Sequence, residues 1–378
     1  MKNKTIVILS QVNFDNSPYT SYTHYHAVEL VNLGYKVIVL ASVTIKPGVD
    51  LNKYTGVHCI DGVDVIYFRR IGFSNILYKS KINLNAISYY MGCRKIIKKI
   101  FDKYNVVLID AHTFKVQGVV ASYLKRKYGV TTFVTLHGTS FERNLHFKNG
   151  IEEIKNVASS IDWMICVSQK IQRNLINLGI INTKVIYNGV NQYEFEKNNN
   201  NYNIISVGYF TKVKNFDKVI MAFAKVVKEV PSARLTIVGD GVLRDDLIRQ
   251  ATDLNVSQYV CFTGALSNDK VNELLSKSNV FVLPSSPEGF GITYVEAMNN
   301  GCIVIGTRGE GIDGFVKDGV NGFLTNVDVD EISDKILYIL NNNCDKIRKT
   351  AIKDAKMLTW ENNAKKYIEL LGDINGEE

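Results

Sequence analysis

Short runs of Val, Ile, Leu and Phe alternate with longer helical patterns along nearly the whole chain. Apolar runs of about four to eight residues, with helices between them, are typical of parallel strands that helices cover on both faces. The expected strands cover residues 5–10, 36–41, 106–110, 132–136, 164–167, 185–187, 204–207, 234–238, 260–263, 280–283 and 302–306. The expected helices cover residues 26–33, 90–101, 118–127, 216–229, 243–253, 267–277, 291–300 and 331–340. The alternation therefore predicts an α/β fold with parallel sheets.

The alternation forms two series, separated by a polar, asparagine-rich segment at residues 194–203. Two βαβ series in succession predict two Rossmann-like domains, and a length of 378 residues fits two such domains. We place the first domain at residues 1–190 and the second at residues 191–359. Ligands of such sheets bind at the carboxyl ends of the strands, so we look for functional residues there.

Composition and charge exclude several classes of protein. Hydrophobic residues make up 46% of the chain, which indicates sizeable cores, yet no apolar run approaches the roughly 20 residues of a membrane-spanning helix. Residues 6–9 are expected to form a buried strand rather than the core of a signal peptide. The six cysteines show no metal-ligand spacing, which predicts a reducing, cytoplasmic location without a disulfide scaffold. Residues 1–190 hold 24 basic and 11 acidic residues, a net +13, whereas the remainder carries −5, unlike a uniformly basic nucleic-acid binder.

The segment at residues 284–297 contains the most informative pattern. An expected strand ends there, and a turn with Gly289 and Gly291 leads into an expected helix. The free amides of a first helical turn suit an anion such as a diphosphate. Glu288 and Glu296 flank the turn with seven residues between them, and carboxylates can grip the paired hydroxyls of ribose or a sugar. On spacing alone, a surface glutamate and a glutamate favoured by the helix dipole explain the pair equally well.

The pattern Pro-Ser-x-x-Glu-Gly-Phe-Gly, with Glu288 and Glu296, resembles the signature of the retaining glycosyltransferases of family 4, which have the GT-B fold. Further segments match that family in order: Val207-Gly208 with Lys214, residues 237–241, residues 262–264, residues 309–312 and residues 317–324. Asn188-Gly189-Val190 resembles the interdomain junction, and Thr135-Leu136-His137-Gly138-Thr139 resembles the active-site histidine loop. The match is dense over residues 185–370, and its combination of motifs is specific.

The resemblance implies a GT-B protein with two Rossmann-like domains that face each other across a donor/acceptor cleft. The first domain would serve the acceptor, completed by a helix over residues 360–378, and the second would bind the nucleotide sugar. The implied reaction moves a sugar, with retention, from a nucleotide-sugar donor to a hydroxyl of a glycan, lipid-linked or small-molecule acceptor. UDP-sugars are the first choice of donor, and no cofactor or metal is expected.

The resemblance also assigns residues to roles. The catalytic set is His137, Glu288 and Lys214. The donor-binding set is Lys212, Gly289, Phe290, Gly291, Glu296, Gly208 and Tyr209. His112 and Ser21 are assigned to the acceptor side. His24 and His26 are expected at the exposed and half-buried faces of a loop–helix junction.

Two positions depart from the family pattern. Tyr209 stands where an arginine usually pairs with the lysine, and Lys212 is a candidate for the second positive charge. The loop at residues 16–23 lacks the usual glycine pair, and hydroxyls of Thr20, Ser21 or Thr23 are candidates to replace its phosphate contacts. Asp328-Val329-Asp330 is an Asp-x-Asp string, but it precedes an expected helix, where acidic residues complement the dipole.

Other functions stay open at this stage. A GT-B nucleotide-sugar epimerase shares the architecture but needs no acceptor, and a non-catalytic nucleotide-sugar-binding subunit would keep the fold alone. A basic helix at residues 94–103 has an apolar stripe at Ile96, Ile97, Ile100 and Phe101. Its lysines predict salt-sensitive, peripheral attachment of the first domain to the anionic inner face of the membrane. No nucleic-acid partner is expected.

Overall fold

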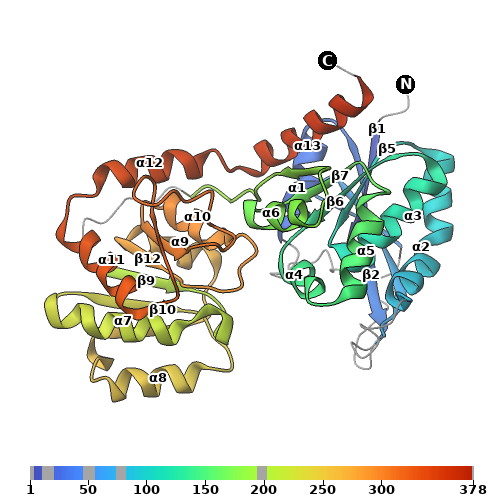
Figure 1. The fold of residues 1–378 in the computed structure, drawn as a ribbon. Coiled ribbons are helices and arrows are strands. Elements are labelled where there is room, and N and C mark those ends of the chain that lie inside the picture. The colour runs from blue at the N-terminus through green and yellow to red at the C-terminus, as the bar shows by residue number, and fades with distance from the viewer. Residues whose placement is uncertain (1–3, 11–20, 46–55, 74–81, 194–201, 377–378) are drawn as a thin grey trace. The chain divides into compact units, whose positions relative to one another are not determined.

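A computed structural model describes residues 4–10, 21–45, 56–73, 82–193 and 202–376 (Figure 1). The chain divides into two compact units, each built around one sheet. The first unit contains Met1–Val167, Ile171–Gly189 and Trp360–Glu378, and the second contains Ser168–Lys170 and Val190–Thr359. The polar segment expected to separate the domains lies mostly outside the described residues.

The sheet of the first unit has eight strands in the order β3-β4-β2-β1-β5-β6-β7-β8. The strands are β1 (Lys4–Ser10), β2 (Lys36–Ile45), β3 (Val57–Ile60), β4 (Val63–Ile71), β5 (Asn105–His112), β6 (Thr131–Leu136), β7 (Trp163–Cys166) and β8 (Thr183–Val185). All neighbours pair in parallel except β3 and β4, which form an antiparallel hairpin. Parallel pairing requires a crossover between strands, so the helices lie on the faces of the sheet.

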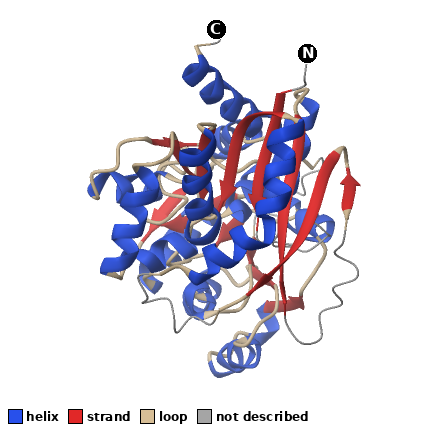
Figure 2. Cartoon of the chain, turned by 90° about the vertical axis from the view of Figure 1, so that its right-hand side faces the viewer, coloured by secondary structure: helices blue, strands red, loops and turns tan. Residues whose placement is uncertain are grey.

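The helices of this unit are α1 (Ser21–Asn32), α2 (Leu84–Lys103), α3 (Val119–Tyr128), α4 (Thr139–Leu145), α5 (Lys148–Ala158), α6 (Gln169–Asn177) and α13 (Trp360–Asn375). Helices α1 and α13 pack on the sheet face that includes Ile6 and Ile8, and α13 contributes Ala364 and Leu371 to that core. Helix α2 covers the opposite face, where Tyr89 packs edge-on against Phe68 of β4. Figure 2 shows helices in front of the strands of this sheet. Both faces of this sheet are therefore covered by helices and buried, as the continuous apolar runs predicted.

The sheet of the second unit has six strands in the order β11-β10-β9-β12-β13-β14, all parallel. The strands are β9 (Asn203–Val207), β10 (Arg234–Val238), β11 (Val260–Gly264), β12 (Val280–Val282), β13 (Ile303–Thr307) and β14 (Phe323–Thr325). The helices are α7 (Phe216–Glu229), α8 (Arg244–Asp253), α9 (Asn268–Ser276), α10 (Ile292–Asn299), α11 (Val329–Asn341) and α12 (Asp345–Lys356).

The strand order reverses between β9 and β12 in the second unit and between β1 and β5 in the first. In a doubly wound sheet the loops on either side of such a switch point diverge, which leaves a crevice at the carboxyl ends of the two strands. The predicted fold class, two Rossmann-like units with parallel sheets, is confirmed. Within the described ranges, no helix is both long enough and apolar enough to span a bilayer. All six cysteines are free thiols.

Candidate functional site

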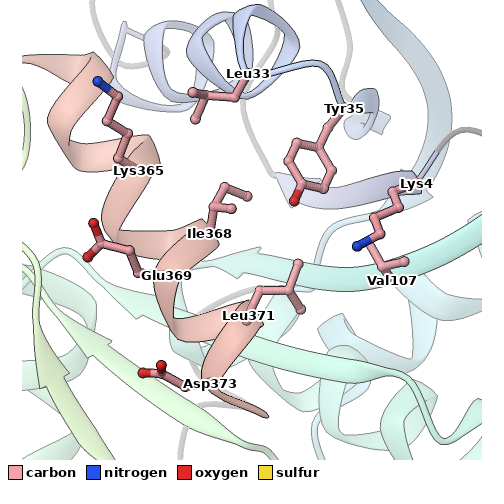
Figure 3. Close-up of a pocket in the computed structure, with 10 residues that line it drawn as sticks. Lys4, Leu33, Tyr35, Val107, Lys365, Ile368, Glu369, Leu371 and Asp373 are labelled. Carbon is pink, nitrogen blue, oxygen red and sulfur yellow. The ribbon is translucent and has the colours of Figure 1, made fainter. Parts of the chain in front are cut away.

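In this fold, the position of a cavity relative to the ends of the strands shows whether the cavity can be a ligand site. A cavity of about 560 Å³ in the first unit lies between Lys4, at the start of β1, Val107, near the start of β5, and residues of α13 (Figure 3). These are the amino ends of the strands. Ligands of parallel sheets bind at the opposite edge, so the candidate site has to be sought at the carboxyl ends.

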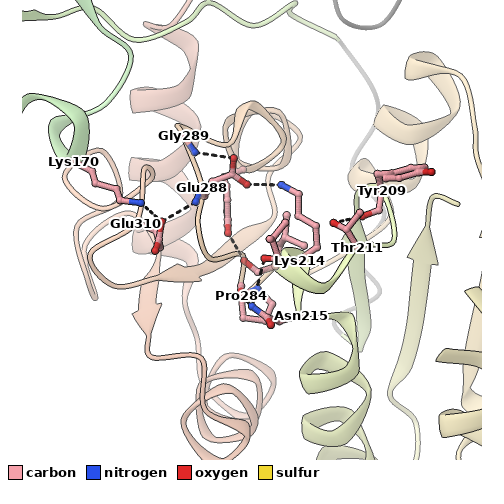
Figure 4. Close-up of polar contacts among 12 residues, drawn as sticks. Lys170, Tyr209, Thr211, Lys214, Asn215, Pro284, Glu288, Gly289 and Glu310 are labelled. Carbon is pink, nitrogen blue, oxygen red and sulfur yellow. Dashed lines mark hydrogen bonds and ion pairs between the residues drawn. The ribbon is translucent and has the colours of Figure 1, made fainter. Parts of the chain in front are cut away.

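The second unit brings Lys214 and Glu288 together at its switch point. Lys214 lies in a short 3-10 turn after β9, and Glu288 lies in the loop after β12. Nζ of Lys214 donates to Oε2 of Glu288 at 2.6 Å, and both side chains are partly buried (Figure 4). Strands β9 and β12 are neighbours in the sheet, which is why residues 74 positions apart meet. A cation and a carboxylate thus stand side by side in the predicted crevice.

Glu310 fixes the loop that carries Glu288. Its Oε2 accepts from the backbone amide of Glu288 at 2.8 Å and from Nζ of Lys170 at 2.6 Å, and its Oε1 accepts from Oγ of Ser286 at 2.8 Å (Figure 4). Lys170 belongs to the second unit, although it lies in the first turn of α6. The sequence analysis quoted Glu310 only as part of a motif and did not consider Lys170. The sequence did carry a signal for Glu310: it is a charged residue between two glycines, shortly after an expected strand.

The turn that leads into α10 depends on glycine. Gly291 has φ of +84°, and a Cβ there would lie 2.5 Å from the ring of Tyr294, so no other residue fits without a rearrangement. Phe290 is buried, and its ring packs edge-on against Phe315. The Gly289 amide donates to Oε1 of Glu288 at 3.1 Å. The turn is therefore held by the buried ring of Phe290 and by the hydrogen bond from the Gly289 amide to Glu288. It leaves the first amides of α10 without helical acceptors.

Glu296 lies in α10 and does not join Glu288 in any contact among the described residues. Its side chain is half-buried, and burial raises the pKa of this carboxyl from 4.5 to about 7. No ion pair to Glu296 occurs among the described residues. A desolvated carboxylate without a cation is a strong acceptor for hydroxyl groups, as the diol-binding interpretation requires.

The remaining residues assigned to donor binding lie in the segment that follows β9. The Gly208 amide donates to the Val238 carbonyl at 3.0 Å, and a Cβ at Gly239 would lie only 1.9 Å from the Gly208 oxygen. Tyr209 is 60% exposed and its ring points away from the ion pair in Figure 4. Lys212 is exposed in the same 3-10 turn as Lys214. Both lysines thus follow β9 on one short turn, with only Lys214 joined to Glu288.

A second cluster forms at the carboxyl ends of β5 and β6 in the first unit. His112 ends β5, and His137 follows β6 directly. Nε2 of His112 lies 2.9 Å from Oδ2 of Asp110, and Nδ1 of His112 lies 3.0 Å from Nε2 of His137. Although burial alone would raise it, the pKa of Asp110 is held well below its usual value by His112 and His26. Burial, and then the nearby His112, lower the pKa of His137 well below its usual value.

Helix α1 adds three aromatic side chains whose placement differs from expectation in part. His26 was expected to be half-buried or exposed, yet it is 1% exposed, with Nε2 at 3.2 Å from Oδ2 of Asp110. The expectation was wrong because α1 begins at Ser21 rather than near His26, so His26 lies a full turn inside the helix and faces the sheet. His24 is half-buried at 3.0 Å from Asp61, and the ring of Tyr22 lies 3.9 Å from that of His137.

The hydroxyls that were expected to replace the phosphate contacts of the missing glycine pair lie mostly outside the described residues. Thr20 and the side chain of Ser21 lie outside the described residues, and Thr23 is buried.

Two groups of residues have the chemistry of metal ligands. His26, Asp110 and His112 bring three ligand atoms within 4.8 Å of one another. Nε2 of His112 and Oδ2 of Asp110 form a hydrogen bond of 2.9 Å, whereas Nε2 of His26, at 3.2 Å from the same oxygen, has no hydrogen-bond partner among the described residues. Asp328 is the N-cap of α11, where its Oδ1 accepts from the amides of Asp330 and Glu331. The helix-start interpretation of the Asp-x-Asp string is therefore confirmed.

Comparison with known families matches both halves of the chain. The family described as Glycosyltransferase Family 4 matches residues 20–192, and the family described as Glycosyl transferases group 1 matches residues 191–357. An uncharacterized glycosyltransferase of Methanocaldococcus jannaschii is 32% identical over 322 residues, which cover 81% of this chain and 87% of that protein. An N-acetyl-alpha-D-glucosaminyl L-malate synthase of Bacillus anthracis is 36% identical over 140 residues, 37% of this chain and 36% of that protein.

Solved structures share the architecture of the whole chain. A sucrose-phosphate synthase of Thermosynechococcus elongatus superposes with a TM-score of 0.77 at 18% identity, covering 99% of this chain and 100% of the other. HepE of Anabaena, in complex with UDP, superposes with a TM-score of 0.76 at 20% identity, covering 98% and 100%. At these identities the likeness concerns the fold.

Proposed function

This chain is a member of glycosyltransferase family 4 with the GT-B fold, and from that premise we propose that it transfers a sugar, with retention, from a UDP-sugar to an acceptor hydroxyl. The acceptor would be a glycan, a lipid-linked sugar or a small molecule in the synthesis of a cell-surface polysaccharide or glycoconjugate. The observation that carries the proposal is the Lys214–Glu288 pair beside the switch point, next to the first amides of α10. A UDP complex of a neighbouring structure, HepE, supports the choice of base.

Donor binding would use the charges of the second unit. The leaving diphosphate gains negative charge as the glycosidic bond breaks, and preorganised cations and amides stabilise such charge. We assign Lys214 to this role, with Lys212 supplying the positive charge that Tyr209 cannot. The amides after Gly291 would hold the other phosphate oxygens. No metal is required by this arrangement of charges.

The glutamates would hold hydroxyl groups. We assign Glu296 to the ribose and Glu288 to the donor sugar, with Gly208, Gly289 and Phe290 shaping the backbone around them. His137 is assigned to a hydroxyl of the same sugar, and Ser21 to the acceptor side. Retention without a nucleophilic carboxylate implies that the acceptor attacks from the leaving-group side, with the donor phosphate taking its proton.

The active-site assignment is tested by replacing Lys214, Glu288 and Glu296 with alanine one at a time. We expect each variant to lose at least about 100-fold in turnover of UDP-sugar, because each loses a contact that grows in the transition state. Lys228→Ala, on the exposed last turn of α7, serves as the matched control and keeps wild-type turnover. Full activity in all three variants, with a folded circular-dichroism spectrum, would refute the assignment.

The same samples discriminate the remaining functions. Proton NMR of the UDP-sugar incubated without acceptor would show a new sugar for an epimerase and an unchanged donor for a transferase. A non-catalytic subunit would bind UDP but convert nothing with any acceptor preparation.

We further propose that the first unit attaches to the anionic inner face of the cytoplasmic membrane through α2. The helix buries Ala86, Tyr89, Cys93, Ile97 and Ile100, while Ile96 and Phe101 are half-buried. The exposed face carries Arg94, Lys95, Lys98, Lys99 and Lys103, together with Ile87 and Met91, which are about half exposed. Each basic residue near an anionic bilayer contributes about 1 kcal/mol, and this attraction is screened by salt.

Vesicle flotation tests this attachment with a matched pair of variants. Neutralising Lys95, Lys98 and Lys99 to glutamine should abolish flotation with anionic vesicles at low salt. The same change at the exposed Lys346, Lys349 and Lys353 of α12, in the second unit, should leave flotation intact. Equal effects of both triple variants, or no binding by the wild type, would contradict the proposal.

A further inference from the structure

We propose that the first unit binds one divalent transition-metal ion such as Zn²⁺ between Nε2 of His26, Nε2 of His112 and Oδ2 of Asp110. The three residues belong to one compact unit and are buried, with exposed fractions of 1%, 3% and 0% in that order. The inference goes beyond the proposed function, because it assigns the ion no part in sugar transfer. It also gives His112 a role other than the acceptor-side role that the sequence predicted.

The fold brings the three side chains to one face of the first sheet. Asp110 and His112 are two residues apart in β5, so both point to the same face of the strand. Leu108, two residues earlier, lies in the core that α1 covers, which identifies that face. His26 lies in α1, and the centroid of its ring is 5.5 Å from that of His112. The three side chains therefore meet under α1 at the carboxyl end of β5.

Asn363 of α13 determines which nitrogen of His26 carries a proton. Nδ2 of Asn363 donates to the carbonyl of Tyr187 at 2.9 Å, so the amide presents its oxygen to His26. That oxygen, Oδ1, lies 2.8 Å from Nδ1 of His26, which must therefore donate. In a neutral ring with its proton on Nδ1, Nε2 carries a lone pair.

This lone pair is close to a carboxylate. Nε2 of His26 is buried 3.2 Å from Oδ2 of Asp110 and has no hydrogen-bond partner among the described residues. A proton on Nε2 would not point at Oδ2 well enough to form a hydrogen bond. A lone pair and a carboxylate oxygen repel each other, and a buried polar atom without a partner is costly. A metal ion beside the line that joins the two atoms would bind both.

The distances between the ligand atoms fit a single ion. Zn²⁺ binds imidazole nitrogen and carboxylate oxygen at about 2.0–2.2 Å, so neighbouring ligand atoms are about 2.9 Å apart at a right angle and about 3.4 Å apart at the tetrahedral angle. Oδ2 of Asp110 lies 2.9 Å from Nε2 of His112 and 3.2 Å from Nε2 of His26. Two imidazoles and one carboxylate suit Zn²⁺ and its first-row neighbours, whereas Mg²⁺ and Ca²⁺ prefer oxygen ligands. Three protein ligands leave a position for water.

Each of the three residues is also oriented by a hydrogen bond at its other polar atom. The partners are Oδ1 of Asn363 for His26, Nε2 of His137 for His112 and Oγ1 of Thr135 for Asp110, at 2.8, 3.0 and 3.3 Å. Metal-binding histidines and carboxylates in proteins usually have such partners, which fix the ring and carboxylate orientations before the ion binds. The cluster thus has both the ligand atoms and the supporting contacts of a metal site.

The test measures the metal content of the full-length protein after removal of any affinity tag. The protein is stripped with a chelator, given an equivalent of Zn²⁺ and dialysed, and the wild type should then retain about one zinc per chain by mass spectrometry. X-ray absorption at the zinc edge should show nitrogen and oxygen ligands without sulfur, because the six free thiols take no part. A 100-fold excess of Zn²⁺ over its Kd should raise the Tm of the stripped protein by about 5 °C.

Variants locate the ion. His26→Gln and Asp110→Asn should each lower the affinity for Zn²⁺ at least about 100-fold, and Asn363→Ala, which keeps all three ligands, should lower it about tenfold. The matched control is His24→Gln, which removes the other histidine of α1 that lies beside an aspartate, Asp61 at 3.0 Å, and it should keep the wild-type affinity.

Several results would overturn the proposal. These are loss of Zn²⁺ from the wild type on dialysis, sulfur among its zinc ligands, and equal affinity in the wild type and Asp110→Asn. The first two are measured on the wild type, so the proposal can fail even if no variant folds. None of these measurements depends on turnover, so a protein that retains Zn²⁺ but transfers no sugar would refute the proposed function alone.

Discussion

Burial of Glu296 should make its replacement by glutamine stabilising at alkaline pH and damaging to donor binding. The pKa of Glu296 is raised from 4.5 to about 7 by desolvation. A tenfold change in an acid constant equals about 1.4 kcal/mol, so ionising this group in the folded protein costs about 3 kcal/mol more than in the unfolded chain. Glutamine is uncharged at every pH and avoids this cost.

The sign of the effect with pH follows from the raised pKa. Below the unfolded pKa of 4.5 the group is protonated in both states and costs nothing, and the full cost applies above about pH 7. Glu296→Gln should therefore raise the free energy of unfolding by about 3 kcal/mol near pH 8 and by about 1 kcal/mol near pH 5. The variant's own stability does not change with the ionisation of this group. The difference grows with pH because the wild type loses stability as Glu296 ionises.

Urea denaturation followed by circular dichroism at the two pH values measures this difference, and calorimetry with UDP measures the loss of binding. The exposed Glu229→Gln in the same unit is the control, and it should change neither stability nor affinity. We expect UDP affinity of Glu296→Gln to fall at least about tenfold near pH 8, because under the proposed assignment the ribose would lose a charged acceptor. An equal gain in stability at both pH values would refute the reasoning, since a buried charge cannot act where it is protonated.

Two further substitutions distinguish a residue that positions the candidate site from a residue that only caps a helix. Glu310→Gln should lower turnover about tenfold, because it weakens the charged contacts to Lys170 and to the Glu288 amide, and steady-state kinetics should show kcat affected more than the affinity for UDP. Asp328→Ala should lower the free energy of unfolding by about 1 kcal/mol through loss of the α11 N-cap, with turnover unchanged. Activity lost in Asp328→Ala and restored by Mn²⁺ would identify a metal ligand instead.

The alternation of apolar runs predicted most of the fold because both sheets are buried on both faces. Strands such as β10 match the expected range to the residue, and α7 does too. The hairpin of β3 and β4 was missed because β3 is short and partly exposed, and because charged residues interrupt the apolar residues of β4 at Asp64, Arg69 and Arg70. Its turn did carry a signal: Asp61-Gly62, with φ of +49° and +81°, is the residue pair that two-residue hairpin turns favour.

Candidate residues were predictable where a motif follows a strand, and less so where contacts come from afar. Lys214 and Glu288 follow neighbouring strands, so their pairing could be inferred from topology. Lys170 and Glu310 are 140 residues apart and carry no shared pattern. Asp110 lies within an apolar strand, where a carboxylate is costly unless paired, and that local conflict was the signal for the histidine cluster.

Net charge turned out to say little about where an anion would bind. The first half of the chain carries +13, but the described side chains at the carboxyl ends of β5 and β6 are Asp110 and histidines, and five of its exposed basic residues lie on α2. The second half carries −5, yet it places Lys214 and Lys212 after β9 at the switch point. A site is set by the few charges that the strand order brings to one edge, because charges on distant helices are screened within about 10 Å. In the functions proposed above, the excess charge of the first half would act at the membrane surface that α2 binds, and the lysines after β9 would act on the donor.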